Sequence, residues 1–186
     1  SAAHEFLTTR MCLRVVLGHF IEQDPASIVF HTHKSGKPYI ALEGLGFNVS
    51  HSHGKAAILV SSRSDVGVDI EYIKRQVYAE GVANRFFSED ENQWLMSHDS
   101  GCMHERFFRV WTGKEALSKA VGKGLSMGLN QYSVIPNDGG ASVQLPQRCE
   151  MLETSSWMIQ WVLDIPDFCC AFTTGADTRS CRVMYL

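Results

Sequence analysis

Residues 66–72 read VGVDIEY, and apolar residues alternate there with small or acidic ones. The apolar positions are Val66, Val68, Ile70 and Tyr72. This period of two is typical of a half-buried β-strand, whose other face here carries Asp69 and Glu71. Side chains two positions apart on one strand face lie about 6.5–7 Å apart along the backbone. The two carboxylates therefore either face water or lie close enough to hold one hard cation between them.

The segments around this strand predict a mixture of helices and antiparallel strands. Helices are expected at 4–20 and 104–124, and the pair Ser88 and Glu91 forms a capping box that starts another helix. Further strands are expected at 27–31, 47–52, 56–62, 131–135, 141–145, 156–165 and 168–174. Helices mixed with hairpin-linked strands indicate an α+β fold.

The length and composition are those of an ordinary soluble globular protein. The 186 residues are 45% hydrophobic and 20% charged, which suits one domain or two small halves that share a core. A formal net charge of −3 argues against a general binder of nucleic acid or of anionic membranes. No apolar run approaches the ~20 residues of a membrane span, and the N-terminus lacks the apolar core of a signal peptide. A cytoplasmic protein is therefore expected.

The six cysteines form no C-x-x-C pair, so the spacing of a zinc knuckle is absent. They are Cys12, Cys102, Cys149, Cys169, Cys170 and Cys181. An even number would permit disulfides, but a chain of this length builds its own core, and several of the cysteines lie in apolar runs. We therefore expect buried free thiols.

The helix expected at 104–124 carries an apolar arc with two charged residues at its edge. The arc consists of Phe107, Val110, Trp111, Leu117 and Val121. Glu115 and Lys119 lie beside it, one helical turn apart. These two residues either form an ordinary i,i+4 ion pair or line a cleft.

Other polar residues gather upstream of the acidic strand. Asn48, Ser50 and His51 crowd hydrogen-bonding groups into one short segment. A histidine in such a run makes either a structural hydrogen bond or a phosphate contact. Arg10 and Lys37 are candidate anion ligands, and a Gly-Lys-Pro turn projects Lys37 from a fixed backbone.

Three segments together resemble the 4′-phosphopantetheinyl transferases in their order and spacing. They read FNVSHS (47–52), VGVDIE (66–71) and WTGKEALSK (111–119). The W-x-x-K-E-A-x-x-K form, the upstream SGKPYI (35–40) and the length are similar to the monomeric, surfactin-synthetase-type branch. The resemblance extends from about residue 4 to residue 135.

The resemblance implies a fold of two pseudo-two-fold related lobes with coenzyme A between them. We expect the N-terminal lobe at 1–62 and the C-terminal lobe, which carries the metal motifs, at 63–186. The implied enzyme moves the phosphopantetheine arm of coenzyme A to a serine of an apo acyl or peptidyl carrier protein, as in fatty acid or polyketide biosynthesis. The leaving group is adenosine 3′,5′-bisphosphate, and the enzyme is expected to be a cytoplasmic monomer.

The family motifs also imply roles for individual residues. Asp69, Glu71 and Glu115 resemble the ligands of Mg²⁺, for which Mn²⁺ is an alternative, and Lys119 would contact the phosphates. The residues that would hold the 3′-phosphate and pyrophosphate of coenzyme A are Arg10, Lys37, Asn48, Ser50 and His51. The catalytic residues that the motifs imply are Glu115, Lys119 and Glu71. The base that deprotonates the carrier serine is Glu115, Glu71 or a metal-bound water, and we favour Glu115 or its water.

Members of this branch usually carry a further N-terminal stretch that supplies basic residues to coenzyme A. That stretch is missing here or was not included, so we expect either a short-form enzyme or a fragment with a weakened substrate site. Lys74, Arg75 and Arg85 follow the metal strand and would either contact an acidic carrier or form a solvated charge cluster.

Two other functions are alternatives to the transferase. A Mg²⁺-dependent hydrolase of nucleotide pyrophosphates would use the same acids without a carrier. A non-catalytic binding module would keep only the fold. The presence of Asp69, Glu71, Glu115 and Lys119 argues against the second.

Overall fold

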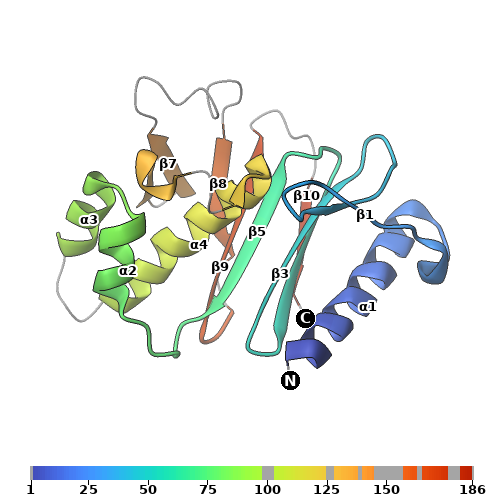
Figure 1. The fold of residues 1–186 in the computed structure, drawn as a ribbon, viewed down its shortest axis with the longest axis horizontal. Coiled ribbons are helices and arrows are strands. Elements are labelled where there is room, and N and C mark those ends of the chain that lie inside the picture. The colour runs from blue at the N-terminus through green and yellow to red at the C-terminus, as the bar shows by residue number, and fades with distance from the viewer. Residues whose placement is uncertain are drawn as a thin grey trace.

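The computed structural model describes residues 2–97, 103–124, 128–137, 140–144, 157–162, 165–175 and 181–185 (Figure 1). Its strands form three antiparallel sheets. A small hairpin joins β1 (His31–Thr32) to β2 (Pro38–Tyr39), and the two larger sheets have the strand orders β10-β4-β3 and β5-β9-β8-β7-β6. The predicted α+β class is thus confirmed.

The first large sheet is covered by the long N-terminal helix α1 (Ala2–Ile21), as Figure 1 shows. Leu13 and Leu17 of the helix pack against apolar side chains of β3 (Gly46–Ser52) and β4 (Lys55–Ser61). The third strand, β10 (Cys181–Tyr185), comes from the far end of the described chain and pairs with β4. The C-terminal end of the sequence therefore completes the sheet of the N-terminal half.

The second sheet is covered by α4 (Met103–Val121), which packs mainly on β5 (Val66–Tyr72) and β9 (Phe168–Gly175). The remaining strands are β8 (Trp157–Val162), β7 (Gly140–Gln144) and β6 (Ser133–Asn137). Two short helices, α2 (Ala79–Phe86) and α3 (Glu89–Met96), flank α4 (Figure 1). Both halves share one plan, a long helix on an antiparallel sheet.

The two large sheets meet where β3 lies beside β5 (Figure 1). Side chains of β3 hydrogen bond to the backbone edge of β5 at this junction. Asn48 Oδ1 accepts from the Val68 amide at 2.8 Å, and Ser52 Oγ accepts from the Tyr72 amide at 3.2 Å. Because buried backbone donors must be paired, these side chains fix the register of one half against the other.

Gly67 lets α4 approach β5 unusually closely. A Cβ atom at this position would lie 2.0 Å from the carbonyl oxygen of Ala116 and 2.5 Å from the amide nitrogen of Ala120. Only glycine fits under the helix backbone at such a distance. The close approach brings the same part of α4, in which Glu115 and Lys119 directly precede Ala116 and Ala120, next to the acidic face of β5.

Several sequence-based expectations are confirmed in detail. The two long helices are present, α4 ends before Gly122 with φ of +76°, and the Ser88 capping box forms in full. Cys12, Cys169 and Cys170 are free thiols as expected, but only Cys170 is buried, and Cys12 and Cys169 are half-buried. Cys102, Cys149 and the side chain of Cys181 lie outside the described part. Burial raises the pKa of Cys170 to about 12, so this thiol stays protonated.

The strand expected at 27–31 is wrong. A 3-10 turn (Pro25–Ser27) occupies its start, and only His31 belongs to a strand. The guanidinium of Arg14 donates to the carbonyl oxygens of Pro25 and Ile28 at 2.8 and 2.9 Å. The Ile28 carbonyl is one that a strand at 27–31 would need for pairing with a neighbouring strand. The lobe boundary after residue 62 stays a prediction. Among the helices in the described ranges, none is long and apolar enough to cross a bilayer.

Candidate active site

The site is built around Asp69, at the point where β3, β5 and α4 meet. Asp69 is buried, with 5% of its surface exposed. Its Oδ1 atom accepts a hydrogen bond from Lys119 Nζ at 2.7 Å and another from Ser50 Oγ at 2.9 Å. Lys119 Nζ also donates to Ser50 Oγ at 3.0 Å and to the Val68 carbonyl at 3.2 Å. One carboxylate oxygen thus joins all three elements.

Glu71 lies two residues further along the same face of β5, and both of its oxygens are engaged. Ser52 Oγ donates to Oε2 at 3.0 Å, and Arg75 Nη2 lies 3.0 Å from Oε1. The side chain of Trp111 donates a further hydrogen bond. Burial, and next the Asp69 charge, raise the pKa of Glu71, while Arg75 opposes the shift.

Glu115 faces this group from α4. Burial raises the pKa of its carboxyl, and the charge on Asp69 raises it further, while Lys119 opposes the shift. Two buried carboxylate oxygens, Glu115 Oε1 and Asp69 Oδ2, have no hydrogen-bond partner among the described residues. Buried acceptors of this kind are costly unless a donor or a cation satisfies them.

Two adjoining clefts lie beside Lys119 and the C-terminal end of α4. The smaller holds about 210 Å³ and is lined in part by Lys37, Asn48 and Lys119. The larger holds about 560 Å³ between the β1–β2 hairpin and the C-terminal end of α4, and Lys37 borders both. Lys37 Nζ donates to the Val66 carbonyl at 2.8 Å, and burial lowers the pKa of this lysine to about 8.

A cleft lined by two ammonium groups, one of them bonded to a buried carboxylate, suits a phosphorylated ligand with a divalent cation. The family model of the 4′-phosphopantetheinyl transferase superfamily matches residues 65–173, the segment that carries Asp69, Glu71, Glu115 and Lys119. The chain belongs to this superfamily. The phosphopantetheinyl transferase resemblance of the sequence motifs is thereby confirmed.

Curated relatives agree with this placement. A 4′-phosphopantetheinyl transferase of Bacillus subtilis is 34% identical over 175 residues, which is 90% of this chain and 77% of the relative. The transferase Sfp of B. subtilis strain 168 is 36% identical over 146 residues, 77% of this chain. The chain spans 64% of the length of Sfp, just under two thirds.

A solved structure also matches part of this phosphopantetheinyl transferase. It is a holo-(acyl-carrier-protein) synthase from Bacillus anthracis in complex with coenzyme A (3′,5′-ADP). The TM-score is 0.48 at 19% identity, with 62% of this chain and 96% of that chain covered. The family model and the curated relatives confirm the predicted enzyme class, a transferase of the 4′-phosphopantetheinyl transferase superfamily.

The structure brings most of the predicted site residues into one place. Those within the acidic group or its adjoining cleft are Lys37, Asn48, Ser50, Asp69, Glu71, Glu115 and Lys119. Asn48 and Ser50 lie two positions apart on β3, so both side chains point to the same side of the strand, toward β5.

Arg10 and His51 lie elsewhere. The Arg10 guanidinium stacks 3.6 Å above the ring centroid of Phe30, and burial lowers its pKa. His51 is exposed on β3 and lines a separate cleft with residues of α1, including His4. Strand alternation puts His51 on the face opposite to Ser50, so the two cannot serve the same part of a ligand.

The basic residues proposed for the carrier are also separated. Lys74 forms an exposed ion pair with Asp167 at 3.7 Å, Arg75 is held at Glu71, and Arg85 lies over the Phe86 ring. The contribution of Gly67 was missed by sequence reasoning. An isolated glycine inside a strand pattern is a signal of close backbone approach and could have revealed it.

The fit of a divalent cation depends on the two unpartnered oxygens. No group of three or more His, Cys, Asp or Glu side chains is arranged to bind a metal in the described residues. Mg²⁺, however, is usually held by one or two carboxylates with substrate phosphates and water completing an octahedron. Asp69 Oδ2 and Glu115 Oε1 therefore fit Mg²⁺, whereas Glu71 is already occupied by Ser52 and Arg75.

Proposed function

We propose that the chain transfers the 4′-phosphopantetheine arm of coenzyme A to a serine of an apo acyl or peptidyl carrier protein in the cleft beside Asp69. One observation carries the assignment of the site. Asp69 and Glu115 each keep a buried oxygen that has no hydrogen-bond partner among the described residues, and Asp69 is bonded to Lys119, which lines a cleft together with Lys37. The family membership of the chain supports the reaction class.

In this reaction the serine oxygen forms a bond to the phosphorus that bears the pantetheine arm. The bond from that phosphorus to the bridging oxygen breaks, and adenosine 3′,5′-bisphosphate leaves with the electron pair. The serine proton passes to a base. Mg²⁺, held by Asp69 and Glu115, would neutralise charge on the pyrophosphate oxygens. Mn²⁺ has the same ligand preferences and is the alternative ion.

Lys119 is proposed to bind the pyrophosphate. Its Nζ lies at the meeting point of Asp69, Ser50 and the Val68 carbonyl, and its side chain also lines the smaller cleft. The contacts hold the ammonium group in a fixed position before a substrate arrives. A fixed cation stabilises charge that develops in the transition state without the cost of reorienting solvent.

Glu115 is the better candidate for the base. Glu71 already accepts hydrogen bonds at both oxygens, whereas Glu115 Oε1 has none from the described residues. If Glu115 also holds the cation, the serine proton passes to a water that it positions. Glu71 then serves to hold α4 at Trp111 and to maintain the negative field of the site.

The rest of coenzyme A is proposed to extend from Lys119 along the cleft past Asn48 and Lys37. The 3′-phosphate ligands implied by the family motifs, Arg10 and His51, lie toward α1 and could contact only a remote part of this ligand. Their roles are proposals, as are a monomeric state and a cytoplasmic location. Fatty acid or polyketide biosynthesis is the proposed setting.

The test is intact-protein mass spectrometry of apo carrier proteins incubated with this chain, coenzyme A and Mg²⁺. A gain of one phosphopantetheine arm that EDTA abolishes is the expected result. Release of free phosphopantetheine without a carrier would favour the pyrophosphate hydrolase instead. If neither product forms while calorimetry shows coenzyme A binding, the chain is a binding module and the proposed reaction is wrong.

A further inference from the structure

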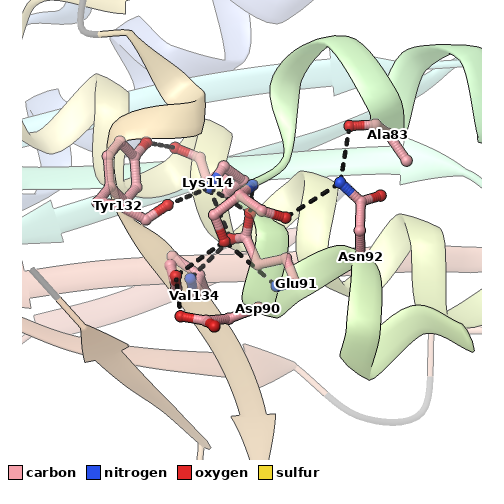
Figure 2. Close-up of polar contacts among 9 residues, drawn as sticks. Ala83, Asp90, Glu91, Asn92, Lys114, Tyr132 and Val134 are labelled. Atoms are coloured by element: carbon pink, nitrogen blue, oxygen red, sulfur yellow. Dashed lines mark hydrogen bonds and ion pairs between the residues drawn. The ribbon is translucent and has the colours of Figure 1, made fainter. Parts of the chain in front are cut away.

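A second charged cluster lies on the other side of α4, away from the clefts. Glu91 of α3 and Lys114 of α4 are both fully buried. Lys114 Nζ donates to Glu91 Oε1 at 2.6 Å, to Glu91 Oε2 at 2.7 Å and to the Tyr132 carbonyl at 2.8 Å. Figure 2 shows these contacts converging between α3, α4 and the start of β6.

Glu91 also joins segments far apart in the sequence. Its Oε1 accepts from the Val134 amide at 2.7 Å, and its Oε2 accepts from the Ser88 amide at 2.7 Å. The Tyr132 ring lies under the Lys114 ammonium at 4.2 Å from its centroid. One carboxylate therefore joins α3, α4 and β6 through directional bonds (Figure 2).

Stability is a weak explanation for this pair. Burial raises the pKa of Glu91 and lowers that of Lys114 to about 8, so each charge is disfavoured where it lies, although each partner opposes the shift of the other. Replacing a buried ion pair by well-packed apolar side chains is often neutral or stabilising. Directional hydrogen bonds restrict the rotation of a helix more narrowly than hydrophobic attraction does, because that attraction is non-directional.

The position of Lys114 in the helix links the pair to the active site. At 3.6 residues per turn, Glu115 and Lys119 project within about 40° of each other, while Lys114 projects about 100–140° away from them. The same stretch of α4 is held on its other side by its close approach to Gly67. Fixing Lys114 thus fixes the direction in which Glu115 and Lys119 point.

We propose that Glu91 and Lys114 are positioning residues that set the rotation and depth of α4, so that Glu115 Oε1 and Lys119 Nζ meet Asp69. The proposal rests on the function proposed above. Neither residue touches the substrate. Their effect reaches the reaction only through the placement of the two α4 side chains that do.

The test uses the whole chain with three changes, Glu91→Gln, Lys114→Met, and the double change Glu91→Leu with Lys114→Met. Glu89→Gln is the matched control, because Glu89 lies in the first turn of the same helix and loses the same charge. Each variant is compared by its melting temperature, by its Mn²⁺ affinity in an electron paramagnetic resonance titration, and by kcat and KM for a carrier. All measurements are made well below the melting temperature.

The double variant decides between positioning and stability, because it leaves no unpaired buried charge and is expected to fold. We expect kcat to fall on the order of tenfold or more and Mn²⁺ affinity to weaken several-fold, since small displacements of catalytic groups have such effects. The KM for the carrier and the properties of Glu89→Gln should stay near those of the unchanged chain. Glu91→Gln keeps the size and one acceptor of the side chain and should show a smaller loss.

A double variant that melts like the unchanged chain and keeps its kcat and Mn²⁺ affinity would overturn the positioning role. If the double variant fails to fold, Glu91→Gln decides instead. A Glu91→Gln variant with the kcat and Mn²⁺ affinity of the unchanged chain would also overturn the positioning role. The Mn²⁺ titration needs neither coenzyme A nor a carrier. Absence of transfer by the unchanged chain would therefore count against the proposed function alone.

Discussion

Lys119 Nζ lies 2.7 Å from Asp69 Oδ1, whereas Oδ2 of the same carboxylate is buried without a hydrogen-bond partner among the described residues. One oxygen of Asp69 is neutralised by the protein, and the other is the oxygen assigned above to the proposed cation. In that proposal a lysine and a metal ion share one carboxylate. This sharing also gives the active site its most direct test.

Asp69→Asn should abolish Mn²⁺ binding and lower turnover by at least about a hundredfold, because the metal's charge stabilisation is worth several kcal/mol. Electron paramagnetic resonance and the mass-spectrometric transfer assay measure the two effects. Glu80→Gln, an exposed change of the same charge on α2, is the control. Full turnover by Asp69→Asn would show that the metal assignment is wrong.

Binding of adenosine 3′,5′-bisphosphate should weaken as the pH rises through about 8, since burial lowers the pKa of Lys37 to about 8 and the ammonium charge is then lost. Lys37→Arg keeps its charge over this range, so its affinity should stay flat with pH. Calorimetric titrations from neutral to alkaline pH test both chains. Parallel curves for the two proteins would remove Lys37 from the ligand site.

The same lysine makes stability depend on pH in a defined direction. The pKa of Lys37 is about 8 in the folded chain and near its ordinary 10.5 when unfolded, so the unfolded chain binds more protons between these values. The contribution of Lys37 to the free energy of unfolding should therefore rise with pH in that window, by up to about 1.4 kcal/mol per pH unit. Urea unfolding of Lys37→Met should show a smaller rise than the unchanged chain. An identical rise would contradict the assignment.

Gly67→Ala should destabilise the chain by about 3 kcal/mol, at the upper end for an overpacked core, because its Cβ would collide with the backbone of α4. The helix must move away from β5, so Mn²⁺ affinity should fall as well. Gly54→Ala is the control: it has a φ of +78° but open space around its Cβ, and should cost about 1–2 kcal/mol. Chemical unfolding compares the two. Equal costs would show that the close approach is not what Gly67 provides.

Lys74→Glu should raise the KM for an acidic carrier on the order of tenfold and leave the KM for coenzyme A unchanged, because charges at a docking rim act mainly on association. Lys74 tests this better than Arg75, whose guanidinium is bound to Glu71 in the active site. Arg182→Glu on β10, in the other sheet, is the control for net charge. Unchanged carrier kinetics would assign Lys74 to a solvated charge cluster.

The acidic site was predictable because its parts obey local periods. Asp69 and Glu71 share a strand face at a spacing of two, and Glu115 and Lys119 share a helix face at a spacing of four. The same period of two also applies to the strand at 47–52. It places Asn48 and Ser50 on one face and His51 on the other, which is the separation that the structure shows.

The parts that could not be predicted depend on partners distant in the sequence. Nothing local indicates that Glu91, a capping-box residue, also receives Lys114 from another helix. The segment 27–31 has β-branched and aromatic residues, but Arg14 of the neighbouring helix binds the Ile28 carbonyl. At Glu91 the local signals are correct but do not reveal the distant partner, whereas at 27–31 a distant side chain accompanies the loss of the strand that local propensity predicts.

The pairing of β10 with β4 has a consequence for the order of events during synthesis. Residues 55–61 leave the ribosome long before residues 181–185, which are their partners from Ser61↔Cys181 to Ala57↔Tyr185. Until then one edge of β4 has no strand to pair with, and exposed edges invite pairing with other chains. The sheet of β3 and β4 can therefore reach its final form only after residues 181–185 have emerged, and contacts this distant in sequence slow folding.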